Sequence, residues 1–134
     1  MSFEELEVGM SFSMSKAFTS EEVEAFSKLS MDKNPLHTNA EFAEKSMFGK
    51  KIVHGFLTAS LFSAIIGTKL PGEGSVYLSQ NLVFLHPVFH NQLVTAIVTV
   101  LELFPEKHRV LLETICKDDS GVVLISGTAL VKIT

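Results

Sequence analysis

The sequence contains one cysteine, no tryptophan and no long run of basic residues. The single Cys116 excludes an internal disulfide framework, suits a reducing compartment and is expected to be a small core residue. The formal net charge of −4 argues against nucleic acid as a partner, because phosphate neutralisation dominates that affinity. The first residues show neither a secretory signal nor a transit peptide. We therefore expect a cytoplasmic protein, or a mitochondrial matrix protein if it is eukaryotic and processed.

Several sequence signatures of large enzyme classes are also missing. There is no Gly-x-Ser-x-Gly elbow, no phosphate-binding G-x-x-x-x-G-K-[ST] and no G-x-G-x-x-G, so hydrolase triads, nucleotides and dinucleotides have no support. His86 and His90 are about 13 Å apart along a strand, too far to share one metal ion. We therefore expect no metal site and no cofactor.

Apolar residues are abundant, at 46% of the chain against 19% charged residues. A chain of 134 residues fits one domain, residues 1–134, with a substantial core. The longest apolar segment is too short and too interrupted for a membrane span. The apolar content exceeds what a soluble monomer needs, so we expect a homodimer interface or an acyl-binding channel.

Hydrophobic periodicity predicts an α+β fold with most helices early and most strands late. The segment 52–70 is apolar on nearly every helical face and should form a helix that is buried all round. The sheet should wrap around this helix, since a barrel without a central helix would leave its apolar residues exposed. The expected strands cover 10–18, 75–88, 92–104, 110–117 and 122–132, the last four joined by short hairpins, and the other helices cover 20–29 and a short segment after His37. Thr19 with Glu22, and Thr38 with Glu41, have capping-box spacing at the starts of these helices.

The segment from Asp32 to His37 contains a candidate acid/base pair. In one continuous helix these two side chains would point in different directions. Pro35 fixes its own φ and forces Asn34 into an extended conformation, so the chain bends and both side chains can point at one site. A solvated loop whose aspartate caps the next helix is the alternative.

The His54-Gly55 pair lies at the start of the apolar segment. Free N–H groups at a helix N-terminus stabilise negative charge, and glycine allows a ligand to approach the backbone closely. Gly55 is equally well explained as a packing residue. Ser63 in the same segment is more often a small packing residue than a functional one.

Two separated motifs, Phe26-x-x-Leu29-Ser30-Met31-Asp32-x-Asn34-Pro35-Leu36-His37 and Ile52-Val53-His54-Gly55, resemble those of the MaoC-like (R)-specific enoyl-CoA hydratases. They occur in the same order and spacing, and the loop Pro71-Gly72-x-Gly74-Ser75 adds to the likeness, which covers nearly the whole chain. The resemblance implies the hot-dog fold, in which a curved antiparallel sheet wraps around a long apolar helix, usually in a homodimer.

The resemblance also implies a reaction and its residues. Asp32 and His37 would catalyse reversible addition of water to a trans-2-enoyl thioester, giving an (R)-3-hydroxyacyl thioester. Gly55 would polarise the thioester carbonyl, and Asn34 and Ser63 would position catalytic groups or water. Ile66 and Val131 would line the acyl pocket.

One position departs from the family pattern, because Met31 occupies a site where relatives often have glycine. We expect a side chain there to exclude a positive φ. The alternatives to an enoyl-CoA hydratase are a 3-hydroxyacyl dehydratase acting on acyl carrier protein, a thioesterase, and a non-catalytic module that binds acyl thioesters.

Overall fold

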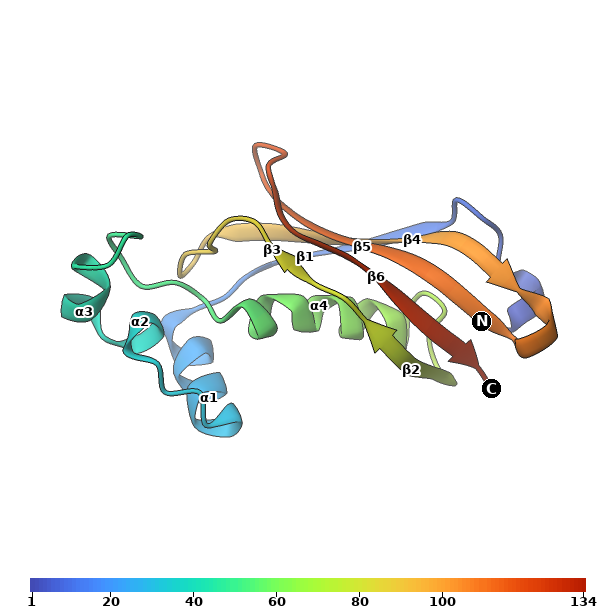
Figure 1. Cartoon of the computed structure of the whole chain (residues 1–134), viewed down its shortest axis with the longest axis horizontal. Helices are drawn as coiled ribbons and strands as arrows, with labels where there is room; N and C mark the ends of the chain where they lie inside the picture. Colours follow the sequence, from blue (N-terminus) through green and yellow to red (C-terminus); the bar gives the residue numbers. More distant parts are fainter.

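The computed structural model describes residues 1–134 as an elongated α+β molecule, in which one long helix lies against a six-stranded antiparallel sheet (Figure 1). Three shorter helices gather at one end. This is the expected hot-dog arrangement. The elements are η1 (Phe3–Glu5), β1 (Ser11–Ala17), α1 (Ser20–Ser30), α2 (Pro35–Thr38), α3 (Ala40–Glu44), α4 (Gly55–Thr68), β2 (Ser75–Gln80), β3 (Val83–Phe84), β4 (Leu93–Phe104), η2 (Pro105–Lys107), β5 (Arg109–Asp118) and β6 (Val123–Ile133).

The sheet order is β1-β4-β5-β6-β2, with β3 also paired to β6. The predicted hairpins β4–β5 and β5–β6 are confirmed. The predicted hairpin between segments 75–88 and 92–104 is wrong, because β2 and β3 pair with β6 whereas β4 pairs with β1. Between β3 and β4, Phe89 forms an isolated antiparallel bridge with Ile52.

The single strand expected over 75–88 is also wrong, since it divides at Asn81. The Asn81 side chain accepts the Thr128 N–H at 2.8 Å, and its backbone oxygen lies against Gly127. A Cβ at position 127 would lie 1.9 Å from that oxygen, so only glycine permits the approach. The bend separates β2 from β3 while both remain on β6.

The core lies between α4 and the inward face of the sheet. From Leu93 to Val100 of β4 and from Arg109 to Cys116 of β5 every second residue is buried, as the two-residue period of a strand requires. Phe62, Ile65 and Ile66 of α4 are at most 1% exposed and complete this core. Cys116 is buried on β5 as expected, and burial raises the pKa of its thiol to about 11.

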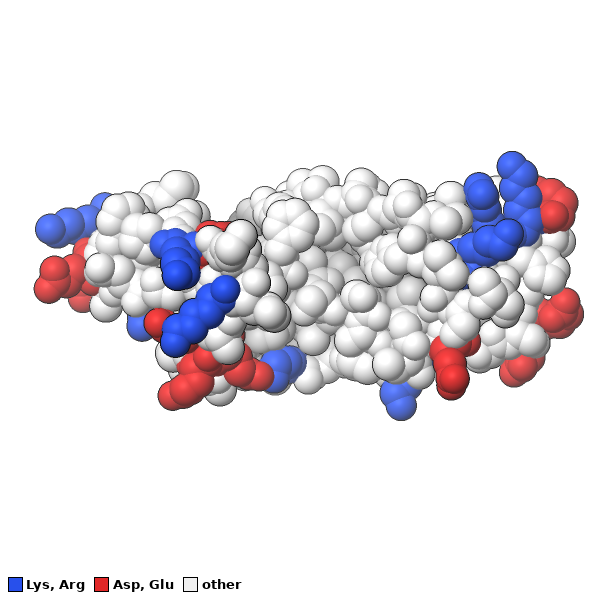
Figure 2. Space-filling view, turned by 90° about the horizontal axis from the view of Figure 1, so that it is seen from below, with Lys and Arg blue, Asp and Glu red and all other residues white.

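Helix α4 is shorter than predicted and is not buried all round. It begins at Gly55 because His54, its N-cap, has a non-helical ψ of 133°, and the Val53 N–H is bonded to the Val88 carbonyl. Phe56 is 70% exposed and lies on the same helical face as Ser63. The face of the molecule seen from below has almost no charge across its centre (Figure 2).

The helices that precede α4 agree only in part with those predicted from the sequence. Helix α1 is confirmed, including the capping box of Thr19 and Glu22. The second predicted helix is wrong in its start, because α2 already contains His37 and Asn39, not Thr38, caps α3. Pro35 at the first helical position favours this early start. None of the helices combines the length and the apolar composition that a membrane-spanning helix needs.

Candidate active site

The turn between α1 and α2 carries Asp32. Met31 ends α1 in the left-handed conformation, with φ 67° and ψ 8°, so the expectation that its side chain excludes a positive φ is wrong. Met31 is 81% exposed, so its side chain meets no packing obstacle, while the local clash of its Cβ with the backbone at positive φ remains. The reversal at Met31 turns the chain toward α2, which places Asp32 beside the start of α4.

Asn34 connects the two halves of the predicted pair. Its backbone N–H donates to the Asp32 carboxylate at 3.2 Å, and its side-chain oxygen accepts the Leu36 N–H at 3.1 Å as the N-cap of α2. One residue thus orients the carboxylate and begins the helical turn that carries His37. The positioning role expected for Asn34 stays a prediction.

His37 is 8% exposed and its ring is oriented by the backbone. Its Nδ1 lies 2.9 Å from the Ile52 carbonyl oxygen. Because a carbonyl oxygen only accepts hydrogen bonds, Nδ1 carries a proton, and in the neutral tautomer of this ring Nε2 is the acceptor. A proton acceptor is therefore available at the tip of this ring.

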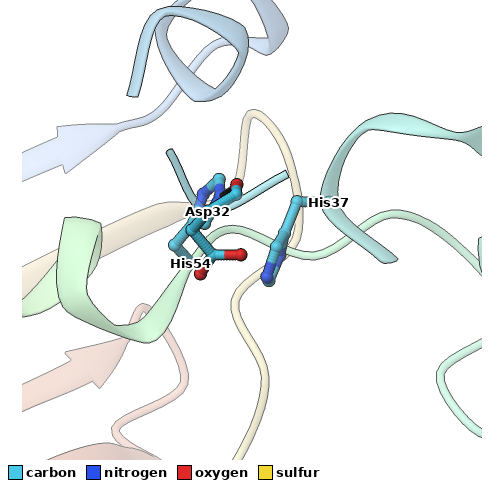
Figure 3. A group of neighbouring side chains, drawn as sticks. All are labelled: Asp32, His37 and His54. Carbon is cyan, nitrogen blue, oxygen red and sulfur yellow. Dashed lines mark hydrogen bonds between the residues drawn. The ribbon is translucent and has the colours of Figure 1, made fainter. Parts of the chain in front are cut away.

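The Asp32 carboxylate points toward the His37 ring in Figure 3, with His54 beside both. One side-chain ligand atom from each of the three residues lies within 4.8 Å of the others. The two imidazole rings are stacked with centroids 3.8 Å apart and planes inclined by 26°. Nearly parallel rings do not aim their in-plane lone pairs at one ion, so the cluster suits proton transfer better than metal binding.

His54 was not expected to take part in the site, although it directly precedes Gly55. Its ring is 1% exposed, packs against Phe26 and His37, and lies 3.1 Å from the Asp32 carbonyl oxygen through Nε2. Burial lowers its pKa below the ordinary value, while the Asp32 carbonyl acts in the opposite direction. The histidine at the N-cap of an apolar helix is the sequence signal that was available for this residue.

Gly55 opens α4 and lines a cavity of about 440 Å³ with mostly hydrophobic walls. Its N–H belongs to the first helical turn, whose donors have no partner within the helix. A Cβ at this position would lie 2.5 Å from the Phe84 ring, which also lines the cavity. The absence of a side chain at Gly55 therefore allows the close packing of Phe84, and the same residue also borders the cavity. Both interpretations drawn from the sequence remain open.

Three predicted site residues lie outside the cluster formed by Asp32, His37 and His54. Ser63 is on the exposed face of α4, eight residues or about 12 Å beyond Gly55. Ile66 and Val131 are at most 1% exposed within the core and do not line the cavity. The roles of these three residues stay predictions.

Comparison with known proteins identifies the family of this chain. The model of the "MaoC like domain" matches residues 4–117. The chain belongs to the MaoC-like family. The (R)-specific enoyl-CoA hydratase of Aeromonas caviae is 46% identical over 133 residues, which cover 99% of each protein. A 3-hydroxybutyryl-CoA dehydratase of Methylorubrum extorquens is 44% identical over 98% of this chain and 83% of that protein.

Solved structures agree with this assignment to the MaoC-like family. The (R)-hydratase of A. caviae involved in PHA biosynthesis superposes with a TM-score of 0.95 at 45% identity, covering 98% of this chain and 99% of that one. An R-hydratase from Pseudomonas aeruginosa in its unliganded form gives a TM-score of 0.93 at 34% identity, covering 98% and 84%. Both confirm the hot-dog fold of this MaoC-like chain.

The conformation of Met31 generates a stability prediction. Met31→Gly is expected to raise the free energy of unfolding by about 0.5–1 kcal/mol, because glycine adopts positive φ without a Cβ clash. The matched control is Leu29→Gly, at a similarly exposed position inside α1, which should lower it by about 1 kcal/mol. Urea denaturation of the two variants measures both changes. Equal destabilisation by both would contradict the left-handed assignment.

Proposed function

We propose that this chain is an (R)-specific enoyl-CoA hydratase that adds water reversibly to trans-2-enoyl-CoA. The observation that carries the proposal is the Asp32 carboxylate facing His37 beside the N-terminus of α4. Its membership of the MaoC-like family and its near full-length similarity to an (R)-specific enoyl-CoA hydratase support the same reaction. We take residues 1–134 to form one hydratase domain.

The reaction needs a water held between a base and the substrate double bond. Asp32 is the principal base, and His37 shares the water through its unprotonated Nε2. The water oxygen forms a bond to C3 as hydroxyl while the C2–C3 π bond breaks. The proton taken from the same water passes through Asp32 and His37 to C2, so the site ends in its starting protonation state.

Negative charge develops on the thioester oxygen while the enolate exists. The N-terminus of α4 is the local source of positive potential, since its first N–H groups are free and its dipole points there. Gly55 carries the first of these groups and borders the cavity. We assign the Gly55 N–H as the donor that polarises the thioester carbonyl.

Removing the base tests the reaction directly. Asp32→Asn should lower kcat for hydration of a short enoyl-CoA by at least about 100-fold, because an amide does not accept the proton. Chiral analysis of the wild-type product should give the (R)-3-hydroxyacyl-CoA. His108→Gln, at an exposed position on the β4–β5 connection, is the control and should leave the rate unchanged. An unchanged rate in Asp32→Asn, or an (S)-product, would refute the proposal.

A larger side chain at position 55 tests whether the Gly55 N–H donates to the thioester carbonyl. Gly55→Ala keeps the N–H but places a methyl group against Phe84 and beside the cavity, so kcat/KM should fall by about 10-fold or more. The double variant Gly55→Ala with Phe84→Ala removes the clash with the ring. If approach to the N–H is what matters, the double variant stays impaired relative to Phe84→Ala alone. Full recovery would assign Gly55 to packing only.

We also propose that the protein is a homodimer. Edge strand β2 exposes three consecutive apolar side chains, Val76, Tyr77 and Leu78, each by 38–44%. Phe56 on α4 is also exposed, by 70%, and the face of the molecule in Figure 2 has almost no charge across its centre. The other edge strand, β1, is richer in serine. A second copy paired along β2 would cover this apolar surface.

Charge placed on this edge tests the dimer. Sedimentation should give a dimer for the wild type and a monomer for Leu78→Asp, because a carboxylate buried in the interface has no partner. Val8→Asp is the matched control, at a position 64% exposed outside β2, and should remain dimeric. A monomeric wild type, or an unchanged dimer in Leu78→Asp, would exclude this interface.

A 3-hydroxyacyl dehydratase acting on acyl carrier protein is the second candidate. A mitochondrial 3-hydroxyacyl-[acyl-carrier-protein] dehydratase of Arabidopsis thaliana is 35% identical over 92% of this chain and 75% of that protein. Parallel rates on CoA and carrier-protein thioesters separate the two activities. Acyl-CoA binding without turnover would instead indicate the non-catalytic module. We propose a cytoplasmic location, in line with the bacterial relatives.

A further inference from the structure

The most deeply buried polar ring of the site is His54, to which the proposed reaction gives no role. It is 1% exposed and lies between the edge of Phe26 and the face of His37. Burying an imidazole is costly unless its nitrogens are hydrogen-bonded, so a ring in this position needs a compensating function. The contacts of its two nitrogens show what that function is.

The Nε2 atom of His54 holds the catalytic turn. It lies 3.1 Å from the Asp32 carbonyl oxygen, and since that oxygen only accepts, Nε2 carries the proton. The Ser27 hydroxyl donates to the same oxygen at 2.8 Å. Two donors, one from α1 and one from the N-cap of α4, therefore fix the backbone of the residue whose carboxylate acts as base.

The Nδ1 atom of His54 must then be an acceptor. It is buried without a hydrogen-bond partner, and so is the hydroxyl oxygen of Thr58. Residues four apart are neighbours on one face of a helix, and Thr58 lies one turn after the N-cap. A hydroxyl can supply the donor that Nδ1 requires, and neither of these two buried atoms has another hydrogen-bond partner.

We propose that His54 is a positioning residue for the hydratase reaction, acting as the Nε2–H tautomer that holds Asp32 and supports His37, and that Thr58 selects this tautomer. The inference rests on the proposed hydratase function for its kinetic consequences only. The lowered pKa of His54 agrees with a neutral ring, which burial favours and which His37 favours by repelling a second positive charge. A neutral ring keeps Nδ1 free to accept.

Substitutions that keep or remove the Nε2 donor test the role in catalysis. His54→Leu should lower kcat by about 10- to 100-fold with little change in KM, because the base is misplaced while the substrate contacts remain. His54→Gln places an amide N–H near the position of Nε2 and should restore most of the loss. The matched control is His108→Leu, at an exposed histidine far along the chain, which should leave kcat unchanged.

The tautomer of His54 can be measured independently of enzyme activity. Nitrogen-15 NMR of the ring should show His54 neutral and protonated at Nε2 across the pH range of activity. Thr58→Val removes the donor to Nδ1 at nearly constant volume, and should shift the tautomer equilibrium and lower kcat by about fivefold. Thr58→Ser keeps a hydroxyl and should keep the wild-type ring signals.

These outcomes separate this inference from the proposed function. A wild type that hydrates enoyl-CoA while His54→Leu, shown by circular dichroism to be folded, keeps its kcat overturns the positioning role. Protonation of wild-type His54 at Nδ1, or equal loss in His54→Leu and His54→Gln, overturns it as well. If the wild type has no hydratase activity the proposed function fails, and the NMR of wild type and Thr58 variants still decides the tautomer.

Discussion

The burial of α4 against the inward faces of the sheet is the constraint on which the rest of this structure depends. Phe62, Ile65 and Ile66 lose nearly all their exposure there, and each contributes about 1.5–3 kcal/mol of transfer free energy. Because the helix cannot rotate or slide without exposing these side chains, its N-terminus has one position. That N-terminus brings His54 and Gly55 to the turn that carries Asp32 and His37. Core packing thus places the chemistry, although no core residue takes part in it.

The site itself is held mainly by backbone groups. The Asp32 carbonyl accepts from Ser27 and His54, the Asp32 carboxylate accepts from the Asn34 N–H, and the His37 ring donates to the Ile52 carbonyl. Each of these bonds fixes either an orientation or a tautomer. The proposed addition of water to an enoyl thioester uses a carboxylate with a defined direction and an imidazole with a free nitrogen. The exposed Asp32 side chain lies where a substrate can reach it, while its backbone is tied to the interior.

Much of this arrangement could be predicted because its signals are local. The capping box at Thr19 and the Asn-Pro turn act over a few residues, and the two-residue alternation of β4 and β5 records burial directly. The strand order could not be obtained in the same way. Segments 75–88 and 92–104 are neighbours in sequence and look like a hairpin, yet β2 and β3 pair with β6, where Gly127 admits the bend at Asn81. The exposed face of α4 was not predicted either, because apolar composition alone does not distinguish a buried face from an exposed one.

The sequence by itself determined that the chain bends at Asn34 and Pro35, which allows Asp32 and His37 to point at one site, and it determined that one apolar helix lies under a sheet. Only the tertiary structure decided that His54 belongs to the same site, because its contact with Asp32 joins residues 22 apart in the chain. It also decided the conformation of Met31, where the turn required to reach α4 outweighs the steric cost of a left-handed methionine. Local sequence sets the conformational preference of each segment, and tertiary packing determines which of these preferences the folded chain adopts.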